Sequence, residues 1–287
     1  MLSVAAALAM LPPPLPPSSA DVLSDEETVW REIRQHSLLY MDVNGGTVLI
    51  ELYPWFAPEN TRNIVELVDA RHFDGGTIDR VQENYVVQWS GAENGPRGDA
   101  AESVPGETVR QSETLDRTSL IPFGDVYAPA VGHWASFPVA RDGQDIWLTH
   151  CYGMVGVGRG EDMDGADGSE LYVVIGQAPR HLDRNITLVG MVRQGMEYLT
   201  SLPRGREALG FYGDDVEKPV ITRIRRGAEI PADERVRLEV LDSEAPSWND
   251  WIDARANRKR DGWFTYSHGA VDLCNLPIPV RPVDRED

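Results

Sequence analysis

Apolar and polar positions along residues 46–91 predict a strand, a helix and a second extended segment, in that order. Over 47–52 the residues alternate between the two faces of a strand. One face carries Val48, Ile50 and Leu52, and the other carries Thr47, Leu49 and Glu51. A helix is predicted next, because Pro58 suits the first helical position, where its missing N–H would have no partner in any case. Apolar residues then recur at helical spacing, at Ile64, Leu67 and Val68.

The second extended segment concentrates the candidate chemistry. After a turn at Gly75 and Gly76, it carries Arg80, Tyr85 and Gln88 toward one neighbourhood. A guanidinium keeps its charge at neutral pH and donates several hydrogen bonds, so it can act as a fixed electrophilic group. An arginine among aromatic and apolar residues therefore marks a candidate site.

These residues, with others further along, resemble the cyclophilins, the cyclosporin-binding class of peptidyl-prolyl cis-trans isomerases. Residues 78–81 read IDRV and 85–88 read YVVQ, where the family has Phe-His-Arg-Val and Phe-Met-x-Gln. Residues 153–157 read GMVGV and 168–173 read GSELYV, where it has a Gly-x-x-Ser-Met-Ala strand and Gly-Ser-Gln-Phe-Phe-Ile. The likeness spans residues 38–226 and is that of a divergent, exported bacterial member.

The resemblance implies a mainly β fold, a closed eight-stranded antiparallel β-barrel capped by two helices. It also implies rotation about the peptide bonds that precede proline, in proline-containing segments of unfolded or exported proteins. That rotation crosses a barrier of about 18–20 kcal/mol because it destroys amide resonance. No covalent chemistry is required, so no cofactor is expected, and the function implied is assistance to the folding of exported proteins.

By the same resemblance, Arg80 stabilises the twisted imide and Gln88 holds the neighbouring carbonyl. The residues expected to line the substrate groove are Tyr85, Val86, Gly158, Arg159, Leu171, Tyr172, His181 and Leu182. Asp79 replaces a histidine of the family and could pair with Arg80, and His181 replaces the aromatic residue that governs cyclosporin affinity, so weak drug binding is expected. The alternative function is a catalytically weak or inactive cyclophilin-like module that binds peptides or acts as a chaperone.

Four further parts surround or interrupt the domain at 38–226. Residues 1–20 are uncharged and rich in alanine, leucine and proline, which favours a signal peptide over a disordered tail. Residues 21–37 are expected to form a lead-in helix. An insertion over about 92–150 is interpreted as a decorated surface loop, although its aromatic residues favour packing over disorder. Residues 227–287 form a C-terminal extension that is expected to pack on the domain, with a surface for a protein partner as the alternative.

The net charge of the 287-residue chain is −19. Such a surface disfavours binding to nucleic acid or to an anionic membrane face. The apolar stretch at 1–20 is too short to span a bilayer. If it is a signal peptide, the expected location is the periplasm, and otherwise the cytoplasm.

The two cysteines, Cys151 and Cys274, leave two arrangements open. In an exported protein they could form a disulfide that ties the extension to the barrel, and otherwise they are two buried thiols. Carboxylates also gather over 161–170, but their spacing does not fit the calcium loop of an EF-hand. A solvated acidic loop is therefore expected there, and no metal site.

Overall fold

The computed structural model describes residues 16–111 and 118–283. The predicted signal peptide at 1–20 thus lies largely outside the described residues. Within those two ranges no helix is both long enough and apolar enough to cross a bilayer.

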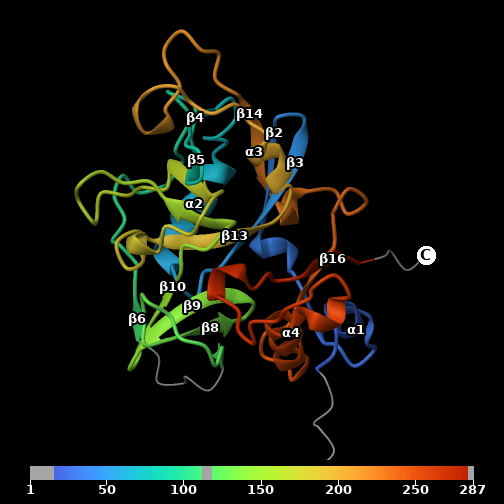
Figure 1. The fold of residues 1–287 in the computed structure, drawn as a ribbon. Helices are drawn as coiled ribbons and strands as arrows, with labels where there is room; N and C mark the ends of the chain where they lie inside the picture. The colour runs from blue at the N-terminus through green and yellow to red at the C-terminus, as the bar shows by residue number, and fades with distance from the viewer. Residues whose placement is uncertain (1–15, 112–117, 284–287) are drawn as a thin grey trace, which may run out of the picture.

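Eight antiparallel strands form one nearly closed barrel, which occupies the upper part of Figure 1. In sheet order the strands are β14 (Ile221–Arg226), β2 (Leu38–Val43), β3 (Gly46–Leu52), β13 (Leu188–Gln194), β11 (Met154–Val157), β12 (Glu170–Val174), β5 (Val86–Ser90) and β4 (Thr77–Val81). Two hydrogen bonds close the sheet, each at 2.8 Å. The N–H of Ile78 donates to the carbonyl of Pro219, and the N–H of Ile221 donates to the carbonyl of Gly76. The predicted mainly β barrel is therefore confirmed.

Two helices cap the barrel, as predicted. Helix α2 (Pro58–Asp69) begins with its proline at the first turn and buries Ile64, Leu67 and Val68 in the barrel core. Helix α3 (Met196–Thr200) adds Leu199 to the same core. The 3.6-residue period of the sequence thus reports the buried face of α2 correctly.

The predicted insertion is not a surface loop but a second, five-stranded sheet. Its strands, in sheet order, are β6 (Arg110–Gln111), β10 (Asp145–Leu148), β9 (Phe137–Asp142), β8 (Ala130–Trp134) and β7 (Ser119–Leu120). Trp134, Phe137 and Trp147 are buried, so the aromatic residues of the insertion do pack, and they belong to a second hydrophobic core beside that of the barrel.

The predicted lead-in helix over 21–37 is wrong in extent. Helix α1 covers Ser19–Ser24 only, and the chain then forms strand β1 (Trp30–Glu32) and the 3₁₀ turn η1 (Gln35–Ser37). Strand β1 pairs with β15 (Leu238–Leu241), which also pairs with β16 (Val280–Pro282). A partner about 200 residues away along the chain therefore overrides the local preference for a helix.

The C-terminal extension shares the hydrophobic core of the insertion. Helix α4 (Ser247–Ala256) buries Trp248, Trp251 and Ile252 in this core, and it lies beside α1 (Figure 1). The remaining 3₁₀ turns are η3 (Arg180–Leu182), η4 (Ala208–Gly210), η5 (Gly227–Glu229), η6 (Arg258–Asp261) and η7 (Leu273–Asn275).

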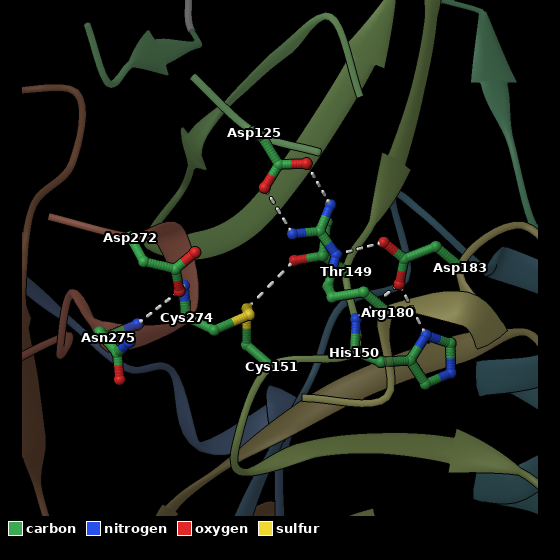
Figure 2. Close-up of a disulfide and its surroundings, with 9 residues drawn as sticks. All are labelled: Asp125, Thr149, His150, Cys151, Arg180, Asp183, Asp272, Cys274 and Asn275. Atoms are coloured by element: carbon green, nitrogen blue, oxygen red, sulfur yellow. Dashed lines mark hydrogen bonds and ion pairs between the residues drawn. A yellow bond between two sulfur atoms is a disulfide. The ribbon is translucent and has the colours of Figure 1, made fainter. Parts of the chain in front are cut away.

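A disulfide joins the extension to the barrel side of the molecule. Of the two arrangements left open for the cysteines, the structure has the bonded one, with an S–S distance of 2.01 Å between Cys151 and Cys274 (Figure 2). The bond closes a loop across 123 positions of sequence. The insertion, the extension and the segment before β11 are therefore held together covalently as well as by their shared core.

Candidate active site

Arg80 and Gln88 lie opposite each other on the hairpin of β4 and β5. The predicted single segment through them is two strands joined by a turn, and the register pairs these two residues directly. Arg80 Nη1 donates to Gln88 Oε1 at 3.1 Å, Arg80 Nε donates to the carbonyl of Leu209 at 2.6 Å, and Arg80 Nη2 donates to Gln82. The guanidinium is thus fixed on three sides, with its two remaining N–H groups unassigned.

Aromatic rings flank the same guanidinium. Its central carbon lies 5.5 Å from the ring centroid of Tyr85 and 5.4 Å from that of Phe211, within the range of cation–π attraction. Burial lowers the pKa of Arg80, while the charges of Tyr85 and Glu170 act in the opposite direction. An arginine so placed stays charged at neutral pH.

The pairing of Asp79 with Arg80 that the sequence suggested is not formed. The Asp79 carboxylate instead accepts hydrogen bonds from Thr77 Oγ1 at 2.9 Å, from Lys218 Nζ at 2.9 Å and from the hydroxyl of Ser90. A β-bulge in the register between Ile78 and Arg80 accompanies this arrangement. The replacement of histidine by Asp79 therefore leaves Arg80 in position.

Glu170 belongs to the site, although the sequence placed it only in an acidic loop. The side-chain amide of Gln88 donates to Glu170 Oε1, so Gln88 presents its oxygen to Arg80 and its nitrogen to Glu170. Burial raises the pKa of Glu170, and the hydrogen bond from Gln88 lowers it in part. The signal was present in the sequence, because Glu170 stands at the glutamine of the family's Gly-Ser-Gln-Phe-Phe-Ile run.

Tyr85, Val86, Tyr172 and His181 come together beside Arg80. Val86 and Tyr172 are buried in one small cluster against which Tyr85 packs. The rings of Tyr85 and His181 are nearly parallel, with centroids 6.3 Å apart. These four predicted residues therefore form an aromatic and apolar cluster, named the slot below because the family resemblance assigns the proline ring to it, and Leu182 follows His181 in the turn η3.

The hydroxyl of Tyr172 has a buried partner, His150. Tyr172 Oη lies 2.8 Å from His150 Nε2, and His150 Nδ1 lies 3.0 Å from Asp183 Oδ1. Burial lowers the pKa of His150 in spite of the carboxylate of Asp183, so the ring is neutral at pH 7. A neutral ring donates from one nitrogen only. His150 thus donates to Asp183 and accepts from Tyr172.

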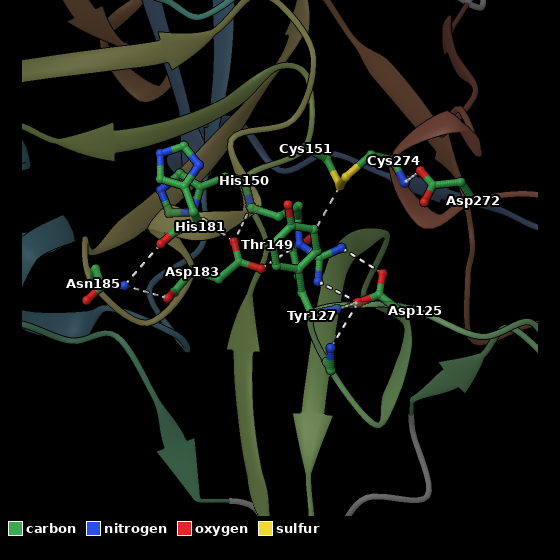
Figure 3. A network of polar contacts seen from close by, with 12 residues as sticks. Asp125, Tyr127, Thr149, His150, Cys151, His181, Asp183, Asn185, Asp272 and Cys274 are labelled. Atoms are coloured by element: carbon green, nitrogen blue, oxygen red, sulfur yellow. Dashed lines mark hydrogen bonds and ion pairs between the residues drawn. A yellow bond between two sulfur atoms is a disulfide. The ribbon is translucent and has the colours of Figure 1, made fainter.

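The polar chain continues from Asp183 into the insertion (Figures 2 and 3). Asp183 Oδ2 accepts from Arg180 Nε at 2.5 Å, and the two Nη atoms of Arg180 donate to Asp125 at 2.9 and 3.2 Å. The Arg180 side chain is 4% exposed, so this is a buried ion-pair network. It connects Tyr172 of the slot to the segment between β7 and β8 of the insertion, and no sequence pattern indicated it.

Leu171 does not lie as predicted. It is buried in the barrel core, because it precedes Tyr172 on β12 and successive strand residues face opposite sides. The guanidinium of Arg159 donates to the carbonyls of Gly160 and Glu161 in its own loop and to that of Asn185 in the loop before β13. Gly158 adjoins Glu170, and a Cβ at this position would overlap that carboxylate.

Comparison with known proteins shows to which family a chain with this geometry belongs. The sequence model of the family described as cyclophilin type peptidyl-prolyl cis-trans isomerase/CLD matches residues 38–225, more than half of the chain. The chain belongs to the cyclophilin family. No curated protein matches this cyclophilin in sequence.

A solved bacterial structure shares the fold. The cyclophilin AquaCyp293 from Hirschia baltica aligns with a TM-score of 0.73 at 21% identity, over 93% of this chain and 98% of its own. The alignment therefore takes in the insertion and the extension as well as the barrel. A cyclophilin type peptidyl-prolyl cis-trans isomerase of Cryptosporidium parvum, solved in the presence of the dipeptide Ala-Pro, aligns at 12% identity with a TM-score of 0.44, over 66% of this chain and 98% of its own.

Metal ligands are not gathered anywhere in the part of the cyclophilin that the structure describes. Over 16–111 and 118–283 there is no group of three or more histidine, cysteine, aspartate or glutamate side chains that could hold an ion. The arrangement at Arg80 offers hydrogen-bond donors and an apolar slot, which suit a reaction without bond-breaking chemistry.

Proposed function

We propose that this cyclophilin accelerates the cis–trans isomerisation of peptide bonds before proline. The observation that carries the proposal is the fixed pair of Arg80 and Gln88 at the edge of the slot formed by Val86 and Tyr172. The family and the fold support the activity, and the local geometry supplies a role for each of these residues.

Catalysis requires stronger binding of the twisted imide than of the planar one. Rotation takes the imide nitrogen out of conjugation and gives it a lone pair that can accept a hydrogen bond. Arg80 has two N–H groups left after its bonds to Leu209, Gln88 and Gln82. Those groups would donate to the twisted imide, while the slot holds the proline ring.

Folding clients in an oxidising compartment fit the same proposal. The disulfide between Cys151 and Cys274 is of a kind that persists mainly in exported proteins. A net charge of −19 favours basic over acidic clients. We therefore infer that the natural substrates are unfolded or extended segments of exported proteins, met in the periplasm.

The test is the isomerisation rate of Ala-Pro and Phe-Pro peptides with the wild-type chain, Arg80→Ala and Arg223→Ala. Arg223 is the matched control, since it lies half-exposed on β14 and its ion pair is with Asp42 on β2, which is not a residue of the site. Loss of one transition-state donor costs about a hundredfold or more, so kcat/KM of Arg80→Ala should fall by that factor and that of Arg223→Ala should not. Absence of catalysis by the folded wild type overturns the proposal.

A peptide-binding module without catalysis is the second candidate. It is favoured by one observation, that three of the five N–H groups of Arg80 already have partners within the protein. Such a module would bind proline peptides with and without Arg80 yet leave their isomerisation rate at the uncatalysed value. The same three proteins therefore decide between the two candidates when binding is measured beside the rate.

A further inference from the structure

We propose that Glu170 makes this site selective for peptides that carry lysine or arginine about two residues from the proline. The inference rests on the proposed function, because it names the substrate class of the same groove. It goes beyond that function in assigning the selectivity to one carboxylate.

The spacing along β12 places Glu170 within reach of such a residue. Tyr172 and Glu170 are two positions apart, so both side chains lie on the groove face, and Leu171 between them points into the core. Alternate residues of a strand are about 6.6 Å apart. An extended peptide covers the same distance in about two residues. With its proline in the slot at Tyr172, it therefore brings a near neighbour over Glu170.

Two carboxylates whose charges act on Glu170, those of Asp79 and Asp167, have a cation as partner, and Glu170 has none among the described residues. Asp79 pairs with Lys218 at 2.9 Å, and Asp167 pairs with Arg97 at 3.0 Å. No lysine or arginine in the described part of the chain forms an ion pair with Glu170, whose hydrogen-bond partner is the neutral amide of Gln88. A half-buried carboxylate without a cation is a costly arrangement that a cationic ligand would relieve.

Arg80 and Arg159 donate their hydrogen bonds elsewhere. Arg80 is anchored by Leu209, Gln88 and Gln82, and Arg159 donates to the carbonyls of Asn185 and Gly160. The charge of Arg80 acts on the Glu170 carboxylate, but neither guanidinium forms a hydrogen bond or an ion pair with it. The carboxylate can therefore accept a hydrogen bond from a cation of the bound peptide.

The surroundings strengthen the attraction. Gly158 has no side chain to cover the carboxylate, and a Cβ there would overlap it. The loop that follows exposes further acidic residues, Glu161, Asp162 and Asp164. A basic peptide is drawn to this side of the groove by the whole loop, and it meets one charge at close range, that of Glu170.

The experiment compares peptides that contain Ala-Pro and carry lysine, glutamine or glutamate two residues before or two residues after the proline. For the wild type, kcat/KM should rank lysine above glutamine above glutamate at one of the two positions, with lysine about tenfold above glutamine, as expected for a hydrogen bond to a charged group. The Glu170→Gln variant should reduce the lysine-to-glutamine ratio to about one. The ratio is taken within each protein, so a change in basal rate cancels.

Glu161→Gln is the matched control. It removes the same charge from the exposed part of the loop and should keep at least half of the lysine preference. Equal rates for the three peptides in the wild type overturn the inference. An equal loss of the lysine preference in both variants also overturns it, because the preference would then come from the summed negative charge of the loop and not from Glu170.

Binding of the same peptides, followed by fluorescence anisotropy, separates this inference from the proposed function. If no peptide is isomerised but the lysine peptide binds most tightly and only Glu170→Gln removes that order, the isomerase proposal fails and the assignment of Glu170 stands. If the peptides are isomerised without any preference, the isomerase proposal stands and the assignment of Glu170 fails.

Discussion

At the scale of single residues, the departures from the family pattern are satisfied by neighbours far away in sequence. Asp79 forms an ion pair with Lys218, and the hydroxyl of Tyr172 forms a hydrogen bond with His150. A buried polar group is tolerated only where it has such a partner. These substitutions therefore leave the guanidinium of Arg80 and the slot beside it intact.

Replacing Tyr172 by phenylalanine should destabilise the protein. The hydroxyl would no longer occupy His150 Nε2, and a buried acceptor left without a partner costs about 1–3 kcal/mol. The free energy of unfolding from urea titration measures the loss. Tyr266→Phe is the control, because that ring is 70% exposed and should change stability by less than about 0.5 kcal/mol. Unchanged stability of Tyr172→Phe would show that the hydroxyl bond contributes nothing.

The preference for basic peptides should depend on pH. Burial raises the pKa of Glu170, and the charges of Asp79 and Asp167 add to this, against the hydrogen bond from Gln88 and the charge of Arg80. Glu170 is ionised above its raised pKa and neutral below it. The lysine-to-glutamine ratio of kcat/KM should therefore have its maximal value at pH 7.5. It should fall toward one as the pH drops through that pKa. A ratio that stays constant from pH 7.5 to pH 4 would contradict the prediction, and Glu170→Gln should be flat throughout.

At the scale of elements, the period of a strand decides what each side chain can do. Along β12, Leu171 and Tyr172 are neighbours in sequence, yet one fills the barrel and the other lines the slot. The family motif named both as groove residues, and the two-residue period of the strand separates them. The alternation of side chains along the strand therefore removes Leu171 from the groove residues that the motif assigned.

Leu171→Ala should therefore act on stability and not on the chemistry. Removing a buried leucine side chain costs about 2–5 kcal/mol, since the barrel core is left with a cavity. The free energy of unfolding should fall by that amount, while kcat/KM of the folded fraction stays within about twofold of the wild type. Val126→Ala, at a position 92% exposed, is the control and should unfold like the wild type. A large loss of activity at unchanged stability would contradict this prediction and would show that Leu171 acts in the groove.

At the scale of the whole molecule, three separate segments build one unit beside the barrel. The N-terminal segment, the insertion and the C-terminal extension share a core, and the first and last of these also share a three-stranded sheet. The disulfide links this unit to the strand that follows Cys151. A cross-link that closes so long a loop restricts the unfolded chain more than a short one does.

Removing the disulfide should lower the stability of the whole protein. For the variant with Cys151→Ser and Cys274→Ser, the chain-entropy argument gives a loss of roughly 4–5 kcal/mol for a loop of this length. The midpoint of urea unfolding measures it. The wild type in reductant should unfold like the double variant, and the double variant should not respond to reductant. Equal midpoints with and without reductant in the wild type would contradict the prediction.

Helix α2 could be predicted from the residues alone, and the barrel and the pair of Arg80 and Gln88 from the resemblance of several short motifs to the cyclophilins. Periodicity and motifs are both local features of the chain, which a sequence displays directly. Helix α2 could be predicted for this reason, because its proline start and its apolar spacing lie within twelve residues.

The remaining features could not be predicted, because the partners concerned are distant in sequence. Glu51, on the second face of β3, is buried because Arg31 and Arg193 pair with it, at 2.9 and 2.7 Å. Residues 30–32 are a strand because β15 lies beside them. For Glu170 the family motif marks the position, but its hydrogen bond with Gln88 depends on the pairing of β12 with β5. Local patterns carry no information on which distant segment will cover a face, so long-range pairing settles these features after the local elements have formed.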